Sequence, residues 1–97
     1  MFLSRLSVAR RAFYSTQIPT GLSEGERHIF TKLTEALSPH KLSVADVSGG
    51  CGSMYAINIA SKQFEGTSIV KQHRMVNEVL KEEIKGMHGL QLKTSAK

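Results

Sequence analysis

The chain has 97 residues, of which 40% are hydrophobic, and this length bounds it to one small domain. Its single cysteine excludes an internal disulfide, and no apolar run approaches the ~20 residues that span a bilayer. The formal net charge is +5, but residues 18–97 hold ten basic against eight acidic side chains. This near balance argues against nucleic acid as the main partner, because phosphate binding requires a clustered positive surface.

Residues 1–17 have the composition of a mitochondrial presequence. They contain three arginines and no acidic residue, and the arginines interrupt the apolar run that a secretory signal needs. Apolar residues recur there at helical spacing: Phe2, Leu6, Ala9 and Phe13. We expect cleavage near residues 13–17 and location in the mitochondrial matrix, with residues 18–21 as a linker. A disordered basic tail is the alternative for this composition.

A first helix is predicted from residue 23 onward. Ser23 and Glu26 fit the capping box, in which each side chain satisfies a free backbone N–H of the other residue. The expected buried stripe consists of Ile29, Phe30, Leu33, Ala36 and Leu37. Pro39 closes the helix, and Gly25 inside it costs about 1 kcal/mol relative to alanine.

Two strands joined by a glycine-rich loop are predicted next. Residues 42–47 are rich in β-branched side chains, and residues 54–60 alternate large apolar residues with small or polar ones. The loop between them, residues 49–53, has glycine on both sides of Cys51, which permits positive φ angles. We therefore expect Cys51 at or near the tip of a hairpin, with a thiol that neighbouring side chains do not shield.

A second helix and a third strand complete the predicted domain. Residues 61–66 form a polar connection anchored by Phe64, and residues 68–85 form the helix. Its buried stripe is expected to contain Ile69, Val76, Leu80 and Ile84. Residues 90–95 alternate as a strand. The order helix, strand, strand, helix, strand predicts an α+β fold whose three-stranded sheet carries both helices on one face.

Cys51 and His73 are the candidate metal ligands. His73 falls at the start of the second helix, close to its apolar stripe, whereas His28 and His40 are interpreted as surface residues and His88 as a turn residue with a structural hydrogen bond. Thiolate and imidazole suit zinc, copper and iron–sulfur clusters. A half-buried core histidine and an inert exposed thiol are the open alternatives.

A site made of Cys51 and His73 requires the hairpin tip to fold over the start of the second helix. Even then it would be incomplete, because zinc and iron–sulfur clusters take four ligands. A partner protein would have to supply the remaining ligands.

The sequence Gly49-Gly50-Cys51-Gly52 also matches the GxxG pattern of KH domains, which clamps nucleic-acid backbone. That loop joins two helices in KH domains, whereas here it is predicted to join two strands, and no basic residue adjoins it. A thiol oxidoreductase is disfavoured because a second cysteine is missing.

The segments VSGGCGSMYAINI and QHRMVNEVLKEEIKGMHGL, with the final strand, resemble the BolA family, and with the presequence and Cys51 its mitochondrial members. The resemblance covers about residues 22–95 and leaves residues 96–97 as a tail. It implies an α/β fold like that of class II KH domains. It also implies that His73 is the characteristic BolA histidine and that Cys51 occupies the loop position that varies between cysteine and histidine.

The resemblance further implies a non-enzymatic adaptor in iron–sulfur assembly. Relatives share a bridged [2Fe–2S] cluster with a monothiol glutaredoxin, whose cysteine and bound glutathione hold one iron, while Cys51 and His73 would hold the other. The expected recipients are late [4Fe–4S] proteins such as lipoate synthase and respiratory subunits. A nucleic-acid-binding or transcription-regulating module is the alternative, since bacterial relatives are thought to regulate transcription.

Overall fold

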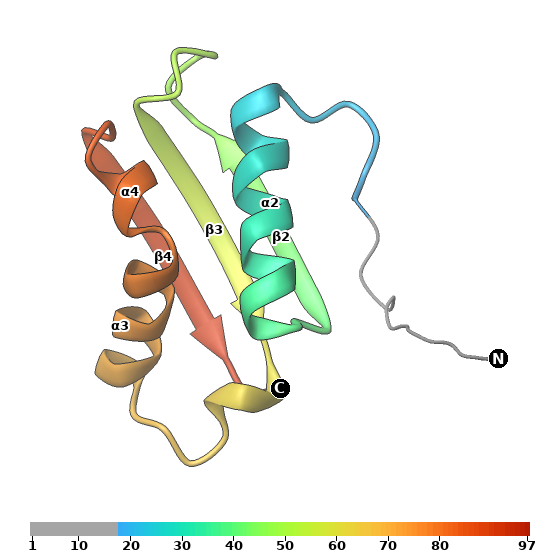
Figure 1. Ribbon diagram of the computed structural model, residues 1–97, viewed down its shortest axis with the longest axis vertical. Helices are drawn as coiled ribbons and strands as arrows, with labels where there is room; N and C mark the ends of the chain where they lie inside the picture. Colours follow the sequence, from blue (N-terminus) through green and yellow to red (C-terminus); the bar gives the residue numbers. More distant parts are fainter. Residues whose placement is uncertain (1–17) are drawn as a thin grey trace, which may run out of the picture.

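Helices cover one face of a small sheet in the computed structural model, which describes residues 18–97 (Figure 1). The elements, in chain order, are α2 (Glu24–Leu37), β2 (Lys41–Asp46), β3 (Met54–Ala60), the 3-10 turn η2 (Lys62–Phe64), α3 (Ile69–Val79), α4 (Lys81–Ile84) and β4 (Gly89–Ser95). This confirms the predicted α+β class and element order, except that the second helix is divided at Leu80. The predicted presequence lies outside the described residues.

The sheet is mixed, with strand order β2-β3-β4. β2 is antiparallel to β3 and places Asp46 opposite Tyr55. β4 is parallel to β3 and places Gly89 opposite Met54. The start of β4 therefore lies at the same end of the sheet as the β2–β3 loop, residues 47–53, although the sequence separates the two by a helical crossover.

The core lies between the sheet and the helices. Its buried side chains are Ile29, Phe30, Leu33, Leu37, Val44, Tyr55, Ile57, Ile59, Phe64, Val76 and Leu80. The capping box of α2 and the anchoring role of Phe64 are confirmed. Two predicted core positions are wrong: Ala36 is exposed, and Ile69, the first residue of α3, is 56% exposed. Gln72 is buried instead, and its side-chain amide donates to the Thr67 carbonyl at 2.7 Å.

Gly25 in the first turn of α2 is explained by Tyr55. A methyl group at the Cα of Gly25 would overlap the Tyr55 hydroxyl oxygen and would lie 3.4 Å from the ring carbon that bears it. Any side chain at this position would therefore force neighbouring atoms to move. The helix thus tolerates an unfavourable residue so that β3 and the N-terminus of α2 can approach each other.

This close approach predicts the effect of Gly25→Ala. We expect it to lower the free energy of unfolding by about 1–3 kcal/mol, the usual cost of overpacking. In a Tyr55→Phe background the obstructing oxygen is absent, so the same change should be neutral or stabilising by up to about 1 kcal/mol through helix propensity. Urea unfolding of the four proteins measures both values. An equal cost in the two backgrounds would contradict this explanation.

Candidate functional site

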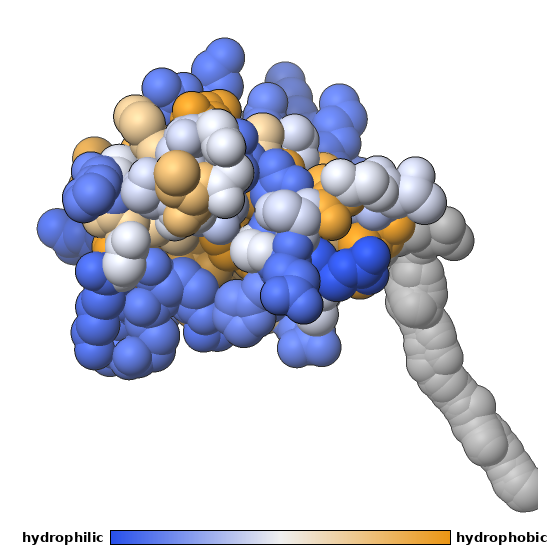
Figure 2. Space-filling model, turned by 90° about the horizontal axis from the view of Figure 1, so that it is seen from above, coloured by the Kyte–Doolittle hydropathy of each residue, from blue (hydrophilic) through white to orange (hydrophobic). Residues whose placement is uncertain are grey.

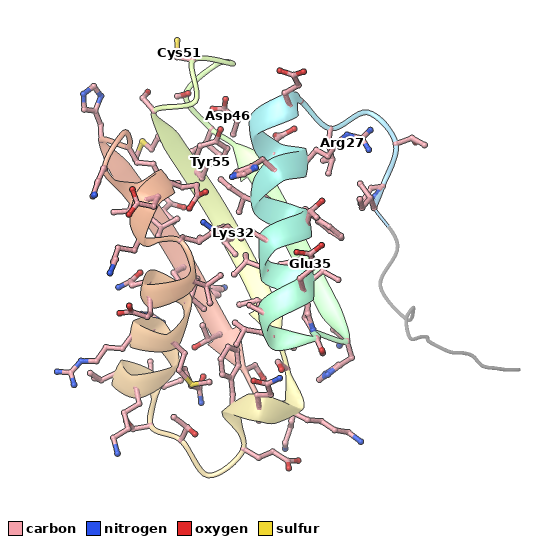
Figure 3. All side chains as sticks on the ribbon, viewed as in Figure 1. Arg27, Lys32, Glu35, Asp46, Cys51 and Tyr55 are labelled. Carbon is pink, nitrogen blue, oxygen red and sulfur yellow. The ribbon has the colours of Figure 1, made fainter. Side chains whose placement is uncertain are left out.

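The β2–β3 loop presents the only cysteine to solvent. Cys51 is exposed, and Figure 3 shows it at the outer tip of the loop, beyond the labelled Asp46 and Tyr55. Its neighbours Gly50 and Gly52 have φ angles of 100° and 73°, which only glycine adopts readily. The predicted position of the thiol at a hairpin tip is confirmed.

The Asp46 carboxylate holds this loop from inside. One oxygen accepts the Ser48 backbone N–H at 2.8 Å and the Ser48 hydroxyl, and the other accepts the Gly52 backbone N–H at 2.9 Å. The Ser48 hydroxyl oxygen in turn accepts the Ser53 N–H at 3.3 Å. These bonds tie both sides of the loop to the last residue of β2.

Asp46 is itself held by the capping box of α2. The Glu26 carboxylate accepts the Asp46 N–H at 2.7 Å with one oxygen and the Ser23 N–H at 2.8 Å with the other. Hydrogen bonds from the backbone of Asp46 and then of Ser23 hold the Glu26 pKa below its ordinary value. The Ser48 hydroxyl and backbone, with smaller contributions from the loop glycines, lower the pKa of Asp46 in the same way. Both carboxylates are therefore ionised acceptors at neutral pH.

His88 lies at the same end of the sheet as the loop. Its backbone N–H donates to the Ser53 carbonyl at 2.6 Å, and the N–H of Gly89 reaches the same oxygen at 3.2 Å. The side chain of His88 is exposed. In Figure 2, which looks onto this end, pale and light orange residues gather between blue hydrophilic ones. The structure thus places an exposed imidazole beside the segment that carries Cys51.

His73 lies elsewhere. It is half-buried on α3 and lines an open groove of about 440 Å³ with Asn77, Lys81, Ile84, Leu90 and Leu92. α3 begins at the end of the molecule opposite the loop (Figure 1). Between His73 and Ile84 the helical segments advance by roughly 16 Å, at ~1.5 Å per residue, toward the end of the sheet where the loop lies. A shared Cys51–His73 site would require the loop to fold over the start of this helix, and in this structure the two lie toward opposite ends of the sheet.

An ionic link fastens the segment that leads to His88. Glu83 on α4 accepts hydrogen bonds across to α2, from His28 at 2.6 Å and from Lys32 at 2.9 Å. Burial raises the pKa of Glu83, but the bonds from Lys32 and His28 outweigh it and lower the pKa overall. His28 is a surface residue, as predicted, with this additional role. The link holds α4 against α2, five residues before His88.

The described residues offer two candidate ligands at one end and no complete metal site. No group of three or more His, Cys, Asp and Glu side chains within residues 18–97 could hold a metal ion. Thiolate and imidazole fit iron or zinc chemically, but two ligands require a second molecule. The GxxG sequence joins two strands and so lacks the helical setting of a KH clamp. No helix in the same range is long and apolar enough to cross a membrane.

Sequence reasoning missed His88 and Asp46 as site residues. For His88, the available signal was its position just before a strand: if that strand pairs in parallel with the one following the cysteine loop, both starts meet at one edge. For Asp46, the signal was an aspartate two residues before Ser48 in a glycine-rich turn, the pattern of an Asx-turn.

Comparison with known proteins identifies a family. The model of the BolA family, described as "BolA-like protein", matches residues 33–97. A bolA-like protein of Schizosaccharomyces pombe is 54% identical over 87 residues, which cover 90% of this chain and 69% of that protein. BolA-like protein 3 of Saccharomyces cerevisiae is 48% identical over 90 residues, which cover 93% of this chain and 75% of that protein.

The fold agrees with solved structures of the family. BolA1 from Arabidopsis thaliana superposes with a TM-score of 0.71 at 32% identity, covering 76% of this chain and 93% of that one. This similarity confirms the expected BolA fold.

Proposed function

Because this chain belongs to the BolA family, we propose that it is a non-enzymatic mitochondrial adaptor that shares a [2Fe–2S] cluster with a monothiol glutaredoxin. The cluster is cargo, and the family resemblance indicates late [4Fe–4S] proteins, such as lipoate synthase and respiratory subunits, as its recipients. One observation carries the proposal: Cys51 and His88, two exposed residues of ligand type, lie on adjoining segments at one end of the sheet.

The incomplete ligand set supports a shared cluster over a resident one. Two ligands from this chain leave one iron to be held by the partner, through the glutaredoxin cysteine and glutathione. An exposed site with split ligands also allows the cluster to leave, which a closed four-ligand site would resist. Ligation requires thiolate and neutral imidazole, so complex formation should weaken as the pH falls.

Reconstitution tests this function directly. The chain is mixed with monothiol glutaredoxin, glutathione, iron and sulfide, and the yield of mixed complex is measured by size exclusion together with its charge-transfer absorption. We expect Cys51→Ser to lower the yield at least about tenfold, since even outer-shell partners of a metal site are worth 10–100-fold. Glutaredoxin alone serves as the control for clusters bound without this chain. An unchanged yield and spectrum would refute the role of Cys51.

A further inference from the structure

The geometry points to Asp46 as a positioning residue that fixes the Cys51 loop for cluster binding, with Glu26 as its support; this inference rests on the proposed function. Asp46 touches neither the sulfur nor any reacting atom. It acts through the backbone on either side of Cys51, at Ser48 and Gly52.

The loop needs such an anchor because of its composition. Glycine loses more conformational freedom on ordering than any other residue, and three of the four residues from Gly49 to Gly52 are glycines with positive φ. Cys51 is exposed, so packing of its own side chain does not fix it. The carboxylate bonds of Asp46 supply the order that side-chain packing would supply elsewhere, and bonds to a charged group are stronger than neutral ones.

A second carboxylate makes the anchor stiff. Glu26 accepts the backbone N–H of Asp46 while it closes the capping box of α2, so the loop is connected through two carboxylates to a helix terminus. Tyr55, which lies opposite Asp46 in the sheet, is close enough to be affected by both charges: burial raises its pKa first, and the charges of Asp46 and Glu26 add to that increase. The position of the thiol therefore depends on α2 as well as on the hairpin.

The test compares Asp46→Asn with Glu78→Gln, which removes the same charge from an exposed carboxylate. Among residues 18–97, the one ion pair of Glu78 is a 3.7 Å contact with Lys81. Amide hydrogen exchange at Ser48 and Gly52 is measured on the isolated protein. We expect exchange at least about tenfold faster in Asp46→Asn and unchanged in Glu78→Gln, since a bond to a charged acceptor is lost only in the former. Glu26→Gln should also accelerate hydrogen exchange at these two amides, but by a smaller factor.

The second readout is the yield of the reconstituted complex. Asp46→Asn should lower it by about tenfold, as outer-shell partners of metal sites do, while circular dichroism shows the fold intact. Unchanged exchange in Asp46→Asn would overturn the anchor. An unchanged yield would overturn its positioning role, provided that Cys51→Ser lowers the yield. If Cys51→Ser has no effect either, the proposed function fails instead, and exchange alone then decides whether Asp46 orders the loop.

Discussion

Replacing His88 by alanine is expected to lower the yield of the cluster-bridged complex at least about tenfold, whereas His73→Ala leaves it largely unchanged. The physical reason is position. The backbone of His88 is hydrogen-bonded to Ser53, two residues after Cys51, while His73 lies in the second turn of α3, which begins at the opposite end of the molecule. The measurement is the same reconstitution, with the charge-transfer spectrum recorded for each variant.

His40 provides a matched control for this comparison. It is an exposed histidine directly before β2, at the end of that strand away from the loop, and its backbone N–H donates to the Ala60 carbonyl. His40→Ala removes an exposed imidazole without touching the loop end of the sheet. We therefore expect a wild-type yield, which would show that the effect of His88→Ala does not come from losing any surface histidine.

The reverse result is equally informative. If His73→Ala lowers the yield and His88→Ala does not, the ligand pair implied by family resemblance, Cys51 and His73, is correct. The arrangement of the ligands in the cluster-bound protein then differs from that in this structure. The loop would then have to move across the sheet end when the partner docks, a rearrangement larger than most interfaces undergo. A loss in both variants would contradict a two-ligand site on this chain.

Local features of this fold were predictable because the physics that creates them is local. The capping box of Ser23 and Glu26 needs only four residues, and the glycines around Cys51 directly indicate positive φ angles. Phe64 was identifiable as an apolar residue isolated in a polar connection. Each of these predictions required no knowledge of what lies across the sheet.

The site was less predictable because it depends on long-range pairing. The helical crossover between β3 and β4 is typical of a parallel pair, but the sequence does not give the register that brings His88 to the Ser53 carbonyl. The carboxylate connection from Glu26 through Asp46 to the loop joins residues that are twenty apart in sequence. Residue type made Cys51 a candidate, but only the register of three strands identifies its neighbours.

Helical periodicity was also an incomplete guide to burial. It assigned Ile69 and Leu80 to one stripe, but Ile69 is 56% exposed and Leu80 is fully buried. Helical periodicity identifies which face of a helix is buried. It does not identify the residue along the helix at which the buried core ends. Ile69 is the first residue of α3 and lies between exposed Ser68 and Val70.

This difference yields the largest expected effect on stability. Leu80→Ala should lower the free energy of unfolding by about 2–5 kcal/mol, because it leaves a cavity in the core between the helices and the sheet. Ile69→Ala should change it by no more than about 0.5 kcal/mol, as exposed substitutions do. Urea unfolding followed by circular dichroism measures both. Equal losses would mean that Ile69 is packed in solution and that the predicted stripe is right.

The Leu80 variant also separates stability from function. Leu80 ends α3 and begins the segment through α4 to His88, and its carbonyl accepts the Ile84 N–H at 2.8 Å. Because small domains have only about 5–15 kcal/mol of stability, Leu80→Ala should lower the Tm and so unfold an appreciable fraction of the chain at a lower temperature than the wild type. Its cluster yield should then fall with the folded fraction and recover on cooling. The yield of His88→Ala should stay low at every temperature, since a missing ligand is not restored by refolding.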